Sequence, residues 1–155
     1  MNYAIPILLL VLTIVAFFGI GRGRYASFGV LQSVLRVIAA LPLLVSGIFL
    51  HFIRATTTAS IIPPLLPAPL FLVFITGLLE IAGAIGLFVP RFRQAAALCI
   101  AIMMVAVFPA NVYAAGKVID GLQMPSVAVR AAMQIVYIVL VLVAGYGLPG
   151  RREIQ

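Results

Sequence analysis

Five long apolar segments constrain this chain of 155 residues more than any other feature. A helix needs about 20 apolar residues to cross a hydrocarbon core of ~30 Å, and each segment is close to that length. Hydrophobic residues make up 65% of the sequence and charged residues only 8%, far from the balance of a soluble domain. We therefore predict an integral membrane protein of the all-α class, a transmembrane helical bundle. The predicted spans run from Tyr3 to Ile20, Val30 to Ile53, Leu70 to Val89, Gln94 to Ala115 and Ser126 to Gly145.

The basic residues lie mainly in the connectors between these segments. If five helices alternate in direction, residues 21–24, 90–93 and 148–155 share one side and hold most of the Lys and Arg. Because cytoplasmic loops are enriched in basic residues, we expect a multi-pass protein of the inner or plasma membrane, with its N-terminus outside and its C-terminus cytoplasmic. The first segment has no basic residue before it and no small-residue cleavage site after it. We interpret it as a retained helix rather than a signal peptide.

Several function classes are excluded by the charge pattern and the cysteine count. A net charge of +7 indicates nucleic-acid binding only when basic residues form a patch, and here they do not. Cys99 has no second cysteine, so a dithiol relay is excluded. His51 is the single histidine, so we expect no metal site. It is either an interfacial residue or a group for proton exchange at the outer mouth, because histidine titrates near neutrality.

Polar residues inside the predicted spans are the most informative ones, because charged groups in hydrocarbon turn toward the protein interior. Each of the last four spans carries such residues, and on the second, third and fifth they recur on one face at spacings of three and four. In the fourth span, Asn111 follows Pro109, which leaves a backbone carbonyl free or kinks the helix. We predict one ligand-binding cavity lined by these faces. Its candidate residues are Arg36, His51, Glu80, Asn111 and Arg130.

Glu80 is expected near the middle of the bilayer. At a rise of ~1.5 Å per residue, Arg36 and Arg130 each lie about 6 to 8 Å from it in height. We predict an ion pair between Glu80 and one of the two arginines, which leaves the other for a ligand, a carbonyl or water. The alternative is that the pair only fixes the helix register, a role that buried ion pairs often have.

The connector of residues 55–69 is apolar but rich in proline, which breaks helices. It cannot form a span. We expect it to lie across the outer mouth of the bundle or in the interface, or to be a stiff loop without another role.

Three segments carry a resemblance to a known family. They read LVSGIFLHF at residues 44–52, TGLLEIAGAIGL at residues 76–87 and FPANVY at residues 108–113. Together with Leu35-Arg36, they resemble the DoxX family over roughly Ser33 to Gly145. The resemblance implies a mostly bacterial, four-helix membrane protein with Arg36, Glu80 and Asn111 at motif positions. The chain then divides into residues 1–29, an extra N-terminal transmembrane helix with a basic connector; residues 30–147, the DoxX-like four-helix core; and residues 148–155, a cytoplasmic basic tail.

The resemblance implies two kinds of function, because DoxX relatives include a subunit of a thiosulfate:quinone oxidoreductase and, more distantly, membrane chaperones for receptors. The first hypothesis is a quinone-linked subunit of a membrane oxidoreductase system. Arg36 or Arg130 would polarise a quinone carbonyl and Glu80 or His51 would pass protons. No cofactor is evident in the sequence besides such a quinone, so a partner would carry the electrons.

Two alternatives stay open beside the quinone hypothesis. One is a non-enzymatic accessory or assembly protein, which binds a partner membrane protein, an exported protein or a second copy of itself. The other is a small lipid or anion binder or transporter. The lipid bilayer is a partner in every case, and the sequence leaves the question of enzymatic turnover undecided.

Overall fold

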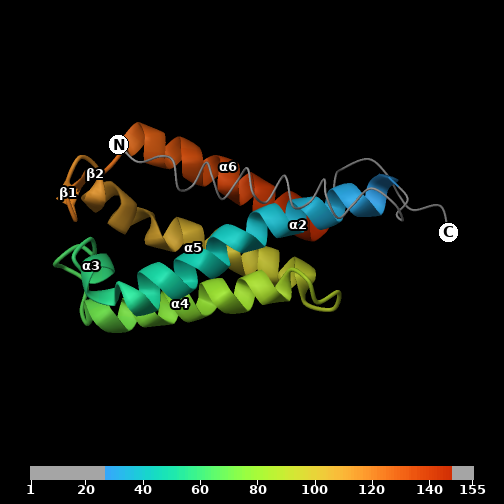
Figure 1. The fold of residues 1–155 in the computed structure, drawn as a ribbon, viewed down its shortest axis with the longest axis horizontal. Coiled ribbons are helices and arrows are strands. Elements are labelled where there is room, and N and C mark those ends of the chain that lie inside the picture. Colours follow the sequence, from blue (N-terminus) through green and yellow to red (C-terminus); the bar gives the residue numbers. More distant parts are fainter. Residues whose placement is uncertain (1–26, 148–155) are drawn as a thin grey trace.

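The structure is a computed structural model that describes residues 27–147 (Figure 1). Four long apolar helical segments cross its length, each long and apolar enough to span a membrane. The predicted all-α class is confirmed, and helices lie at the last four predicted spans, with ends that differ by about three residues or fewer. The first predicted span, its connector and the basic tail lie outside the described residues.

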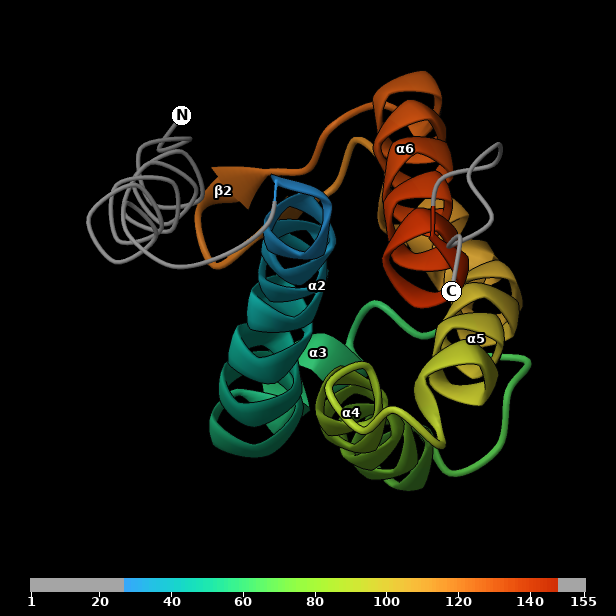
Figure 2. The same ribbon diagram turned by 90° about the vertical axis from the view of Figure 1, so that its right-hand side faces the viewer.

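The first described span has two parts, the α-helix α2 (Ser27–Val45) and the π-helix η1 (Ser46–Ile53). The remaining spans are α4 (Pro69–Gly86), α5 (Arg93–Ala114) and α6 (Val127–Tyr146). Seen along their axes, they form a ring in the order α2, α4, α5, α6, in which each helix packs on its two neighbours (Figure 2). We predicted a regular helix where η1 lies, and the wider turn of a π-helix is a common feature of functional sites.

Alanines make up five of the nine core residues of this ring, and small residues are typical of helix packing in membranes. The outward surface carries large apolar side chains instead, and Val105 and Val136 are 62% and 68% exposed. Hydrocarbon solvates such a surface, which supports the membrane location. The core residues are Ala39, Ala40, Leu43, Ala84, Leu87, Ala97, Ile100, Val141 and Ala144.

Glycines set the spacing between α4 and its neighbours. A Cβ added at Gly83 would lie 2.6 Å from Ile100 Cγ1, and one at Gly86 would lie 2.7 Å from Ala96 Cβ. The two helices therefore approach closely near the turn that joins them. Toward its other end α5 departs from α4 (Figure 1).

The opposite end of the bundle holds the short helix α3 (Ala55–Ala59) and a hairpin of β1 (Val118–Ile119) and β2 (Leu122–Gln123), as Figure 1 shows. Asp120 and Gly121 link the strands with φ of 50° and 74°, the left-handed pair that a tight two-residue hairpin requires. Asp120 Oδ2 also forms an exposed ion pair with Arg54 Nη1, at a distance of 3.1 Å. The connector after α3 forms turns rather than a span, as expected.

Candidate functional site

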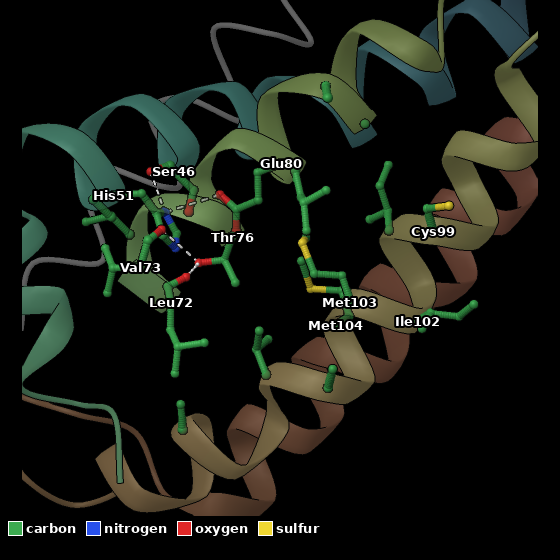
Figure 3. Close-up of a pocket in the computed structure, with 18 of the residues that line it drawn as sticks. Ser46, His51, Leu72, Val73, Thr76, Glu80, Cys99, Ile102, Met103 and Met104 are labelled. Carbon is green, nitrogen blue, oxygen red and sulfur yellow. Dashed lines mark hydrogen bonds and ion pairs between the residues drawn. The ribbon is translucent and has the colours of Figure 1, made fainter. Parts of the chain in front are cut away.

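A cavity of about 1300 Å³ lies between the diverging halves of α4 and α5 (Figure 3). Its walls are mostly apolar, and the connector after α3 contributes Ile61, Ile62 and Leu66 at one end. Four of the five predicted site residues line it. They are His51, Glu80, Asn111 and Arg130.

Glu80 and His51 meet on one wall of the cavity, as Figure 3 shows. Glu80 comes from the middle of α4 and is only 7% exposed. His51 Nδ1 lies 3.5 Å from Glu80 Oε2 and 3.1 Å from the backbone oxygen of Ser46. Because a carbonyl oxygen can only accept, Nδ1 carries the proton in this contact. In the neutral form of the ring, Nε2 is then the acceptor.

The approach of His51 to α4 depends on Gly77. A Cβ at this position would collide with the His51 Cβ. The π-helical turn and this glycine together bring the imidazole beside Glu80, one turn farther along α4.

Arg130, Asn111 and Gln134 form a hydrogen-bonded chain between α5 and α6. Arg130 Nη2 donates to Asn111 Oδ1 at 2.7 Å, and Asn111 Nδ2 donates to Gln134 Oε1 at 2.8 Å. Gln134 Nε2 then donates to the Met104 carbonyl at 2.9 Å. Asn111 and Arg130 reach the cavity, so the wall opposite Glu80 presents a fixed guanidinium.

Two buried side-chain atoms of residues 27–147 have no hydrogen-bond partner, and both belong to residues that line the cavity. They are Glu80 Oε2 and Arg130 Nε. Leaving a buried polar group unsatisfied costs about 1–3 kcal/mol, more for a charged group, so such atoms need an explanation. Both atoms are covered by neighbouring protein atoms, so the cavity itself does not expose them.

The predicted ion pair between Glu80 and an arginine is wrong. Within the described residues, Glu80 contacts His51 and Arg130 is held by Asn111. The estimate from helical rise gave heights along the membrane normal but not the direction in which each helix face turns.

Arg36 lies outside the residues that line the cavity, contrary to its prediction as a site residue. Its Nε donates to the Ala144 carbonyl at 3.2 Å. Gln32 Nε2 donates to the same carbonyl and to that of Val143, at 2.9 and 2.7 Å. The last carbonyls of a helix lack partners within the helix and attract cations. Arg36 therefore caps α6.

Some features of the cavity were missed in the sequence. The Ser46 carbonyl became a partner of His51 through the π-helical turn, for which the sequence has no simple signal. The contribution of Gln134 could have been predicted, because it lies four residues after Arg130 on the same helix face. Across the described part of the chain, no group of three or more His, Cys, Asp or Glu side chains could hold a metal ion.

Comparison with known proteins gives one match. No curated protein and no solved structure matches the chain. The resemblance to DoxX therefore stays a prediction. Residues 39–144, about two thirds of the chain, match the family model described as "Domain of unknown function (DUF8561)". Because this match covers more than half of the chain, the chain belongs to the DUF8561 family. The matched residues include every residue that contributes to the two polar walls of the cavity.

Proposed function

We propose that this protein binds an isoprenoid quinone in the cavity between α4 and α5, as the quinone-linked subunit of a membrane oxidoreductase system. One observation carries the proposal: a mostly apolar cavity between α4 and α5 is lined by a few polar side chains, Glu80 and His51 on one wall and Asn111 and Arg130 on another. A ligand with a polar head and an apolar tail matches this arrangement.

The size and the position of the cavity support an amphiphilic ligand. Ligand cavities commonly measure about 300–1,000 Å³, so a volume of about 1300 Å³ admits a ring and part of a tail. Leu79, Ile85 and Ile102 line the cavity and are 49%, 56% and 59% exposed, in keeping with a cavity that is open at the side of the bundle. A tail can therefore leave the cavity between α4 and α5 into lipid.

The proposal assigns electron transfer to a partner subunit. The described residues offer no metal-ligand group, and the chain has a single cysteine. The resemblance to DoxX supports such a division of work, and we keep DoxX membership as part of this proposal. We also propose that the basic turn between α4 and α5 faces the cytoplasm, since positive loops mark that side.

A second function, an accessory protein for exported or membrane partners, is favoured by the connector after α3. Leu65 in this connector is 94% exposed at the end of the bundle, beside the partly exposed Leu66. An apolar surface of this kind can bind an extended segment of another protein. Crosslinking from Leu65→Cys in intact membranes would then capture one specific partner, whereas a crosslink only between copies of this chain would contradict this function.

Lipid extraction tests the quinone proposal. Protein purified in mild detergent or in nanodiscs is expected to retain quinone that mass spectrometry detects. Ala106→Phe places a ring in the cavity and should remove most of it. Val136→Phe makes the same kind of change on the exposed face of α6 and should retain it. Absence of quinone from the unmodified protein, together with no binding of added quinone, would overturn the proposal.

A further inference from the structure

We infer that Gln134, which does not line the cavity, positions the Arg130 guanidinium for the quinone head and thereby sets the affinity for quinone. The inference rests on the proposed function and adds a positioning residue to it. Among the described residues that line the cavity, α6 contributes Arg130 alone. Gln134 lies one turn farther along α6 and acts through Asn111, which contacts both side chains.

Arg130 depends on Asn111 for its place at the cavity. The cavity lies between α4 and α5, whereas Arg130 belongs to the start of α6, the neighbour of α5 in the ring (Figure 2). Within residues 27–147, the guanidinium has one oxygen partner, Asn111 Oδ1 at 2.7 Å, besides a contact of 3.7 Å between Nη1 and the Met124 sulfur. The ion pairs of these residues do not include Arg130. A long side chain with so few partners needs Asn111 to hold it in one position.

The chemistry of its two ends fixes the direction of the hydrogen-bonded chain. At one end, the Met104 carbonyl can only accept, so Gln134 turns Nε2 toward it, at 2.9 Å. Gln134 Oε1 then faces Asn111 and accepts from Nδ2 at 2.8 Å. This leaves Asn111 Oδ1 for Arg130, whose guanidinium can only donate. Each amide therefore has the one orientation that satisfies both of its neighbours.

Gln134 ties the Asn111 side chain to a rigid part of the bundle. Asn111 belongs to α5 and Gln134 to α6, and Gln134 is itself held by a backbone carbonyl of α5. Without Gln134, the Asn111 amide would keep one partner, the long and flexible side chain of Arg130. The two side chains could then adopt several rotamers, and a ligand would have to order them when it binds. Because ordering of side chains opposes binding, the affinity for quinone should fall.

The decisive measurement is a double-mutant cycle on quinone affinity. Purified full-length protein in nanodiscs is titrated with a fully substituted decyl-benzoquinone. Gln134→Met removes both hydrogen bonds of the amide at similar side-chain size and should weaken binding about tenfold. In an Arg130→Met background the same change should weaken binding less than about twofold, because the guanidinium that Gln134 positions is already absent. Gln123→Met makes the same change in the exposed strand β2 and should keep the affinity.

The infrared spectrum of the bound quinone gives a readout that a loss of packing alone does not move. A carbonyl stretch falls in frequency when its oxygen accepts a strong hydrogen bond, and hydrogen bonds from a guanidinium are of this kind. We expect Gln134→Met to move the lowered carbonyl band back toward its frequency in free quinone. Gln123→Met should leave the band in place.

The outcomes separate this inference from the proposed function. Unchanged affinity in Gln134→Met, an equal loss in both backgrounds or an unshifted carbonyl band would overturn the role of Gln134 while leaving quinone binding in place. Absence of quinone binding by the unmodified protein would overturn both. If Gln134→Met does not fold, Gln134→Asn serves instead, with the same expected outcomes. It keeps the amide but is one methylene too short to bridge Asn111 and the Met104 carbonyl.

Discussion

His51 Nδ1 lies 3.5 Å from Glu80 Oε2, and the same nitrogen donates to the Ser46 carbonyl at 3.1 Å. The contact joins η1 to α4 where Gly77 allows the two backbones to approach. A single geometry thus serves two purposes. It packs two spans closely, and it fixes the imidazole so that its other nitrogen is left for a ligand.

Gly77→Ala tests the packing part of this arrangement. The added methyl group would collide with the His51 Cβ, and overpacking of this kind typically destabilises by about 1–3 kcal/mol. We expect a lower midpoint of thermal unfolding in detergent. Gly29→Ala is the matched control, because a Cβ there has no atom within 4 Å. In α2 it should be neutral or stabilising by up to about 1 kcal/mol. Equal midpoints for the two variants would contradict the close approach of η1 and α4.

Arg36 and Arg130 should separate stability from binding. Arg36→Gln removes a hydrogen bond and a charge at the end of α6, which should cost about 1 kcal/mol of stability without changing quinone affinity. Arg130→Lys keeps the charge but removes the planar guanidinium that Asn111 holds at the cavity, so quinone affinity should fall about tenfold. Unfolding curves and titrations in nanodiscs measure both quantities. The assignment fails if Arg36→Gln weakens binding as much as Arg130→Lys does.

The spans could be predicted from the sequence because hydrocarbon thickness fixes the length of an apolar run. The cavity residues could be predicted in part for a similar reason, since Glu80 and Arg130 must turn away from lipid. Their partners could not. Arg36 has the same chemistry as Arg130, but the free carbonyls at the end of α6 lie closer to it, and only the packed helices reveal this.

Two local features of the backbone, the hairpin turn and the π-helix, differ in how far the sequence predicts them. The Asp120-Gly121 pair is a known hairpin signal, so the turn between β1 and β2 could be predicted from the sequence. The π-helical turn after Ser46 could not be predicted, because it depends on how α2 and α4 meet around Gly47 and Gly77. Residue types therefore indicated which groups turn inward, while helix contacts decided which of them meet.

Cys99 provides a natural reporter of occupancy, because it is the single cysteine of the chain and lines the cavity. We expect N-ethylmaleimide to label it in nanodiscs. Quinone at about ten times its Kd should slow labelling about tenfold, because the fraction of protein without ligand falls in proportion. Val136→Cys in a Cys99→Ala background lies on the lipid face of α6 and should show no protection. Equal protection at both positions would indicate a general effect on the bilayer and would contradict a ligand in this cavity.

The orientation of the bundle can be tested at its two ends. Leu65 is 94% exposed in the connector after α3, and Arg91 is exposed in the turn between α4 and α5. In a Cys99→Ala background, a membrane-impermeant maleimide should label Leu65→Cys in intact bacterial cells. It should label Arg91→Cys only after the cells are permeabilised, because the positive turn is expected on the cytoplasmic side. The reverse pattern would place the basic turn outside and contradict the proposed orientation. Labelling of both positions in intact cells would contradict the crossing of the membrane by α4 itself.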